Sequence, residues 1–227
     1  MMKVLSAMLL STILIAFGYV YTCYYFSDKQ INSIKSEKLD KAILKLNRNR
    51  ILYLVFSVLV VMILVYLFQS VYSLGLIDQL KLLSLVLIME PMAAIDHKVQ
   101  KIPNQLLIVG LVVRIIILVV EFSVSFNSGL TMLMEDIIGA LIIGLFFLLM
   151  FFVFKNSIGM GDIKLFGLIG LYQGLWGAVN KVFFSLLVSF FVSVSLLITR
   201  KKSRTDSIAF GPSILLGTIV AIALSGM

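Results

Sequence analysis

The sequence predicts an all-α protein that crosses a membrane with about eight helices. Hydrophobic residues make up 61% of its 227 residues, charged residues make up only 13%, and the mean hydropathy is +1.11. Soluble globular domains carry roughly 45–50% apolar and 25% charged residues, so the composition excludes that class. Most of the apolar runs reach or approach the roughly 20 residues that a helix needs to cross a bilayer. We therefore expect one polytopic helical bundle.

Eight apolar runs mark the expected spans. They cover residues 4–25, 51–74, 82–95, 106–120, 137–154, 163–179, 182–198 and 208–224. The first run follows Lys3 as a signal peptide would, but it is too long, lacks a small-residue cleavage site and contains tyrosines typical of a membrane interface. Residues 1–75 are thus expected to form a pair of spans joined by a polar loop at 27–50, and residues 76–227 a six-span core.

The basic residues gather in segments that strict alternation places on one side of the membrane. The loop 27–50 is rich in lysine and forms either an amphipathic helix on the inner leaflet or a solvated loop. The other basic groups are Lys98 with Lys101, Lys155 with Lys164, and the run Arg200, Lys201, Lys202 and Arg204. The positive-inside rule makes this side cytoplasmic and places both chain ends outside. The outer loops are expected at Asp78 and Lys81, at Glu121, Glu135 and Asp136, and at Asn180 and Lys181.

The net charge and the cysteine count exclude several other classes. The charge of +8 comes from short segments beside apolar runs, which is how membrane topology is set, so we expect no nucleic-acid partner. The single cysteine, Cys23, lies in the first apolar run and is interpreted as a packing or lipid-facing residue. One cysteine allows neither a disulfide framework nor a multi-cysteine zinc site within the chain.

Two aspartates are the leading candidates for catalysis. Asp96 follows the third apolar run, and Asp162 opens the sixth after the turn Gly159-Met160-Gly161. A carboxylate at the centre of a membrane helix costs about 2.5–3.5 kcal/mol, so acids near the hydrocarbon are rarely without function. The alternating topology brings both to the cytoplasmic face, although 66 positions separate them (162 minus 96).

Such a pair suits hydrolysis of a peptide bond. Two carboxyl groups within hydrogen-bond reach share a proton and titrate as a coupled pair. One can take a proton from water while the other protonates the substrate carbonyl, and neither a metal nor another cofactor is needed. The alternative is that both aspartates are loop residues without a catalytic role that help to set the membrane topology.

Three further ionisable residues have open roles. His97 adjoins Asp96 and is interpreted as solvated or hydrogen-bonded rather than catalytic. Glu90 either modulates the site or contacts substrate, or else is a buried packing carboxyl. Arg114 lies midway along its span, where it either snorkels to the interface or pairs with an acid such as Glu90.

Three motifs together resemble the type IV prepilin peptidases. They are Asp96 followed by Ile102-Pro103-Asn104, then Gly159-Met160-Gly161-Asp162-Ile163-Lys164-Leu165, then Ala209-Phe210-Gly211-Pro212-Ser213. The resemblance runs from residue 82 to the C-terminus. It implies a membrane GxGD aspartic endopeptidase that removes the basic leader of type IV prepilins or pseudopilins at the cytoplasmic side. It maps the catalytic aspartates onto Asp96 and Asp162.

The motifs also supply residues that we expect to shape the site. These are Gly159, Gly161, Pro103, Asn104, Lys164, Gly211 and Pro212. Pro103 suits the first turn of a helix, where a missing N–H is tolerated, and the glycines allow close approach. Gly211 and Pro212 either shape the site or simply begin the last helix. Gly167, Gly170, Gly174 and Gly177 form a stripe of small residues that is interpreted as a packing face.

The chain departs from the bifunctional members of that family in one respect. Those members carry a cytoplasmic zinc-binding methyltransferase region with two CxxC pairs between their first two spans, whereas the segment 27–50 contains no cysteine. We therefore expect cleavage without N-methylation. The substrate's apolar helix is expected to provide specificity among the spans, and anionic lipid or the acids Asp28, Glu37 and Asp40 to hold its basic leader.

Two rival functions remain from the sequence. Paired membrane acids also serve proton- or ion-coupled transporters, but here they lie at one face and no internal repeat is evident. A pilus-assembly scaffold without activity is the other rival, against which the presence of both aspartates argues. The sequence carries no signal for an oligomeric state.

Overall fold

The computed structural model describes residues 2–28, 48–154, 158–199 and 208–226, which form helices and no strand. The helices are α1 (Met2–Asp28), α3 (Arg48–Ser70), α4 (Leu76–Val99), α5 (Asn104–Val124), α6 (Phe126–Val153), α7 (Met160–Ile198) and α8 (Gly211–Ser225). Five segments are long and apolar enough to cross a membrane: Ala7–Tyr25, Ile51–Ser70, Asn104–Val124, Phe126–Val153 and Met160–Ile198. The multi-pass helical bundle is confirmed, but eight separate spans are not supported.

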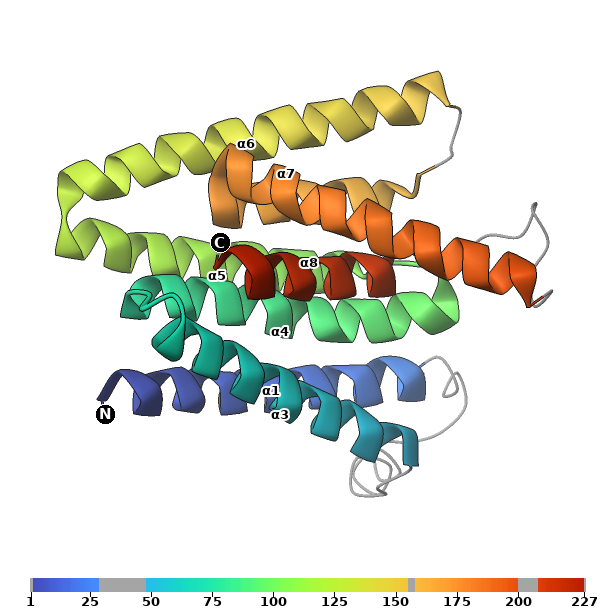
Figure 1. Cartoon of the computed structure of the whole chain (residues 1–227), viewed down its shortest axis with the longest axis horizontal. Helices are drawn as coiled ribbons and strands as arrows, with labels where there is room; N and C mark the ends of the chain where they lie inside the picture. Colours follow the sequence, from blue (N-terminus) through green and yellow to red (C-terminus); the bar gives the residue numbers. More distant parts are fainter. Residues whose placement is uncertain (1, 29–47, 155–157, 200–207, 227) are drawn as a thin grey trace.

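The helices alternate in direction along the bundle (Figure 1). The marked N- and C-termini lie toward the left-hand end of that view. The helix ends that border the predicted cytoplasmic segments, such as the end of α4 and the start of α7, lie toward the right. The alternation thus groups these ends together, while the side of the membrane that they face stays a prediction. Most of the loop 27–50 and the run 200–204 lie outside the described residues.

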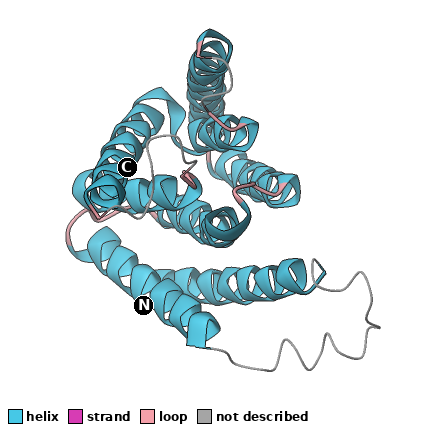
Figure 2. Cartoon of the chain, turned by 90° about the vertical axis from the view of Figure 1, so that its right-hand side faces the viewer, coloured by secondary structure: helices cyan, strands magenta, loops and turns pink. Residues whose placement is uncertain are grey.

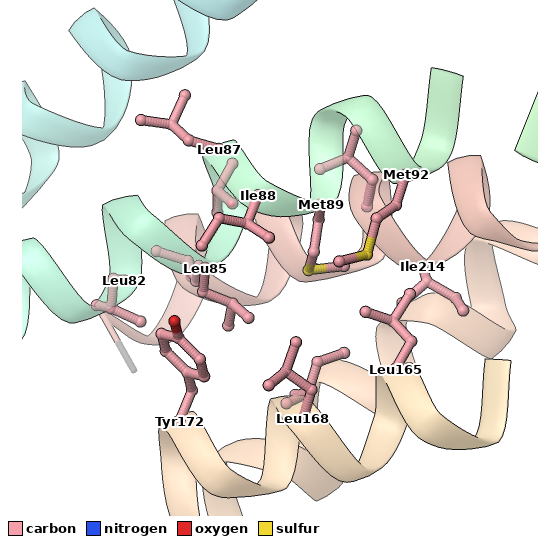
Figure 3. Close-up of a cluster of buried hydrophobic side chains, with 14 of the residues drawn as sticks. Leu82, Leu85, Leu87, Ile88, Met89, Met92, Leu165, Leu168, Tyr172 and Ile214 are labelled. Atoms are coloured by element: carbon pink, nitrogen blue, oxygen red, sulfur yellow. The ribbon is translucent and has the colours of Figure 1, made fainter. Parts of the chain in front are cut away.

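Helix α4 is the centre of the bundle. It packs against α1, α3, α5, α7 and α8, and nearly every residue from Gln79 to Asp96 is buried. Figure 3 shows its Leu82, Leu85, Met89 and Met92 facing Leu165, Leu168 and Tyr172 of α7, with Ile214 of α8 beside them. Seen from the end in Figure 2, α1 and α3 form a separate layer on one side of the remaining helices.

The apolar run 82–95 is part of a longer helix. Helix α4 has 24 residues and is therefore about 36 Å long. Asp78 and Lys81, expected in an outer loop, lie in its first turns. The apolar run begins only after these charged residues, but the helix includes them. Lys81 is buried in the helix because it pairs with Glu121.

Helix α7 folds back on itself at Gly174. This glycine has φ 61° and ψ −169° inside an otherwise helical segment, a conformation in which a side chain is strained. Figure 1 shows α7 running toward the left, bending and then returning to the right. The predicted division between 163–179 and 182–198 is wrong, because Asn180 and Lys181 are helical and the bend lies earlier.

Two glycines, one of them from the predicted stripe, mark the contact between α6 and α7. A Cβ on Gly170 would lie 2.6 Å from Ala140 Cα, and a Cβ on Gly139 would lie 2.4 Å from the carbonyl carbon of Gly174. The two backbones therefore approach closely at these glycines. A Cβ on Gly167 would meet no atom within 4 Å, so the packing interpretation holds for only part of the stripe.

Two of the acids expected in the outer loop before 137 are buried within helices. Glu121 lies in α5 and Asp136 in α6, and only Ser125 separates these helices. Both acids pair with Arg114. Arg114 therefore neither snorkels nor pairs with Glu90. The prediction that Glu121 and Asp136 lie in an outer loop is also wrong, because both are buried in helices where they neutralise the charge of Arg114.

Candidate active site

Asp96 lies in the last turn of α4, which ends at Val99 and is followed by Gln100. The Gln100 amide donates to the Asp96 carbonyl at 2.8 Å, and Gln100 has the left-handed conformation of a helix terminus. The Asp96 side chain is only 5% exposed. Its Oδ2 accepts a hydrogen bond of 2.8 Å from the Gly211 amide, and the Phe210 backbone contributes another. The start of α8 therefore holds this carboxyl in place.

The carboxyl of Asp96 lies beyond the apolar run 82–95 and titrates under opposing influences. Burial raises its pKa, while the Gly211 amide, His97 and the Phe210 backbone lower it, and the net direction is upward. A raised pKa keeps a larger fraction of Asp96 protonated near neutral pH. A protonated carboxyl at this position can donate a proton.

Asp162 occupies the first turn of α7 and is half-buried. Gly159 is the residue before the helix, and its carbonyl accepts the Asp162 amide at 3.0 Å. The Gly159 backbone also hydrogen-bonds the Asp162 carboxyl. A Cβ on Gly159 would lie 2.9 Å from Asp162 Oδ2, so a side chain at 159 would displace this carboxyl group. The two carboxyl groups are close enough for the negative charge of Asp96 to act on Asp162.

The starts of α5 and α7 also meet beside the two aspartates. A Cβ on Gly161 would lie 2.9 Å from Ile102 Cβ, so glycine lets these segments approach. The Lys164 ammonium donates to Asn104 Oδ1 at 3.0 Å. Pro103 immediately precedes α5 instead of lying in its first turn, whereas Pro212 lies in the first turn of α8. The structure thus brings together the residues of all three motifs.

Aromatic rings pack under this convergence and were not predicted. Phe166, one turn beyond Asp162, stacks on Phe147 of α6 with ring centroids 4.3 Å apart. Its edge meets Phe210, which precedes the Gly211 amide, at 5.8 Å. The rings connect the Asp162 helix to the segment that holds Asp96. The 17 phenylalanines of the chain gave no signal by which to single out these three.

The remaining candidates point elsewhere. His97 is exposed, although its charge still acts on Asp96. Glu90 is 2% exposed and accepts a hydrogen bond from Ser57 of α3, so its carboxyl faces the N-terminal helices. Within the described parts of the chain, no three histidine, cysteine, aspartate or glutamate side chains gather as metal ligands would.

Similarity to known proteins covers the part of the chain that carries both aspartates. Residues 80–198, just over half of the chain, match the model of the type IV leader peptidase family. A protein of Bacillus subtilis (strain 168), described as a prepilin leader peptidase/N-methyltransferase, is 28% identical over 149 residues. The alignment covers 66% of this chain and 56% of that protein, so the chain spans little more than half of its relative. No solved structure matches. With a family match that covers α7 and nearly all of α4, this chain belongs to the type IV leader peptidase family.

Proposed function

We propose that this chain is a membrane aspartic endopeptidase that removes the basic leader of type IV prepilins or pseudopilins at the cytoplasmic face. The observation that carries the proposal is the convergence of Asp96 and Asp162, from helices far apart in sequence, at one end of the bundle. Family membership supports the reaction class. Both carboxyls sit at helix ends, where a peptide bond outside the hydrocarbon can reach them.

In the proposed mechanism the two carboxyl groups share one proton. The ionised group removes a proton from a water molecule as the water oxygen attacks the scissile carbonyl carbon. The protonated group gives its proton to the carbonyl oxygen. The tetrahedral intermediate then collapses: the carboxyl group that took the proton from water gives it to the amide nitrogen as the C–N bond breaks, and the other carboxylate takes a proton back from a hydroxyl of the intermediate. The amide of Gly211 keeps the Asp96 carboxyl oriented throughout.

Electrostatics shapes the proposed substrate contacts. Lys98, Lys101 and Lys164 are exposed near the two aspartates, so a basic leader meets like charge there. We propose that anionic lipid headgroups, with the acids of segment 27–50, offset this repulsion, and that the substrate's apolar helix provides specificity by packing among the spans.

Co-expression with a candidate prepilin tests the reaction. The mass of the purified pilin N-terminus should correspond to the mature form when this chain is present and to the full precursor when it is absent. A substrate that keeps its leader beside a membrane-inserted, full-length chain would count against the proposed substrate class.

We further propose that the chain does not methylate its product. The name of the Bacillus relative includes N-methyltransferase, but the alignment leaves 44% of that protein unmatched (100 minus 56). The only cysteine of this chain, Cys23, lies in α1, so the thiolates of a structural zinc site are not available between the first two helices. Incubation with a prepilin and labelled S-adenosylmethionine should leave the mature peptide unlabelled. A gain of one methyl mass that depends on this chain alone would refute the proposal.

A further inference from the structure

The first leg of α7, residues 160–173, carries Asp162 at its beginning and ends at the Gly174 bend. The last four carbonyl groups of a helix lack partners within it. Side chains provide hydrogen-bond partners for two of these carbonyl groups. Arg114 Nε donates to the Leu171 carbonyl at 2.8 Å, and Gln173 Nε2 donates to the Tyr172 carbonyl at 3.2 Å. Lys181, itself buried, donates to Gln173 Oε1 at 2.9 Å. Arg114 therefore lies at the negative end of this leg, where the helix dipole favours a cation.

Arg114 is itself held by an ion network that we define as Lys81, Arg114, Glu121 and Asp136. Its Nη2 donates to Glu121 at 3.0 Å and also to Asp136. Lys81 Nζ lies 3.6 Å from the other oxygen of Glu121. All four residues are buried, and their formal charges cancel. The network joins α4, α5 and α6 to the end of the first leg.

The same end of the leg is fixed by close packing. The Tyr172 hydroxyl donates to the Gly110 carbonyl of α5 at 2.8 Å. Gly139 meets the backbone of Gly174, where a Cβ would lie 2.4 Å from the carbonyl carbon. These contacts therefore fix the position of the C-terminal end of the first leg.

Stability alone does not account for the network. Replacing buried ion pairs by apolar side chains is often neutral or stabilising, because desolvation offsets the attraction. What a guanidinium adds is geometry, since its planar fork can serve a carbonyl and two carboxylates at once.

We propose that the ion network sets the position of the first leg along the bundle axis and thereby places Asp162 opposite Asp96. The leg is a rigid rod about 20 Å long, so a shift at the bend is carried to Asp162. The four residues are positioning residues, because they contact neither aspartate. The catalytic consequence rests on the proposed function, whereas the geometric consequence does not.

A disulfide reporter measures the position of the leg without any substrate. Ile102→Cys and Gly161→Cys are introduced on a Cys23→Ser background. A Cβ on Gly161 would lie 2.9 Å from Ile102 Cβ. A disulfide needs a separation of roughly 3.5–4.5 Å, so the two cysteines can be bridged once these segments move apart by about 1 Å. The reporter is placed in the full-length chain in membranes. Cleavage of a prepilin is measured in parallel on chains without the cysteine pair.

Two variants disturb the network and one serves as a matched control. Asp136→Asn removes one carboxylate that holds Arg114, and Arg114→Lys keeps the charge but cannot reproduce the fork. The exposed Glu135→Gln makes the same carboxylate-to-amide change one position away, outside the network. We expect both network variants to reduce disulfide formation at least twofold and leader cleavage roughly 10- to 100-fold, the scale on which a displacement of about 1 Å acts. Glu135→Gln should change neither.

The outcomes separate this proposal from the proposed function. Unchanged disulfide formation in both Asp136→Asn and Arg114→Lys, at normal abundance, overturns the positioning role whatever the cleavage results. The positioning role is also overturned if disulfide formation falls in the network variants but falls by the same amount in the control Glu135→Gln. Reduced disulfide formation in the network variants alone supports it. In that case, absence of cleavage by the parent chain refutes only the peptidase assignment.

Discussion

At the scale of single residues, Gly211 is the nearest support of Asp96. Its amide donates to Oδ2, and a Cβ on Gly211 would lie 2.9 Å from that oxygen and 3.0 Å from Asp96 Cβ. The carboxyl thus fills the space that a side chain would need. Because a buried carboxylate depends on such a hydrogen bond for its orientation, the glycine acts on the reaction through Asp96.

Replacing Gly211 with alanine should therefore displace Asp96. We expect leader cleavage to fall roughly 10- to 100-fold, because a small misplacement of a reacting group is costly, while the chain accumulates normally in membranes. Initial rates on a prepilin, normalised to the amount of folded enzyme, provide the measurement. The control is His97→Ala, which alters an exposed neighbour of Asp96. Equal rates for Gly211→Ala and the parent chain would remove Gly211 from the site.

Most of the candidate residues of this site could be named from the sequence because its motifs bracket the two aspartates. It could not reveal that the Gly211 amide binds Asp96, since 115 positions separate them and the start of a helix explains Gly211-Pro212 equally well. Arg114 was ambiguous for a related reason. Its partners Glu121 and Asp136 border apolar runs and therefore resembled loop residues, while only the fold shows that they are buried together.

At the scale of helices, hydrophobicity located each helix but missed the bend of α7. Gly174 lies inside the predicted span 163–179, where the adjacent polar residue Gln173 alone does not indicate a reversal. Asn180 and Lys181 resemble a loop, although both are helical. The bend depends on tertiary contacts: glycine at 174, the close approach of Gly139 and the side chains that bind the exposed carbonyls. Single-sequence patterns do not carry these contacts.

Two glycines of α7 form a matched pair that tests the contact with α6. Gly170→Ala introduces a Cβ 2.6 Å from Ala140 Cα, so we expect destabilisation of about 1–3 kcal/mol from overpacking. Gly167→Ala meets no atom within 4 Å and should be neutral or stabilising by up to about 1 kcal/mol, because alanine favours a helix. Thermal unfolding of the detergent-solubilised variants measures the difference. The same unfolding temperature for both would mean that the backbones do not approach as described.

At the scale of the whole molecule, the alternating direction of the helices brings together the helix ends that border the basic segments. The positive-inside rule then predicts a cytoplasmic site, with both termini outside. Lys101→Cys on a Cys23→Ser background tests the orientation, because Lys101 is exposed between α4 and α5. We expect an impermeant thiol reagent to label it only after the cells are opened. Labelling in intact cells would reverse the topology.

The central claim is that Asp96 and Asp162 act together in peptide cleavage, and their replacement by asparagine tests it most directly. Each change conserves volume but abolishes the shared proton, so either alone should stop the reaction. The mass of the pilin N-terminus should show the intact leader with Asp96→Asn or Asp162→Asn, at near-normal enzyme abundance, and the mature form with the control Glu135→Gln. Full cleavage by Asp162→Asn would contradict the claim.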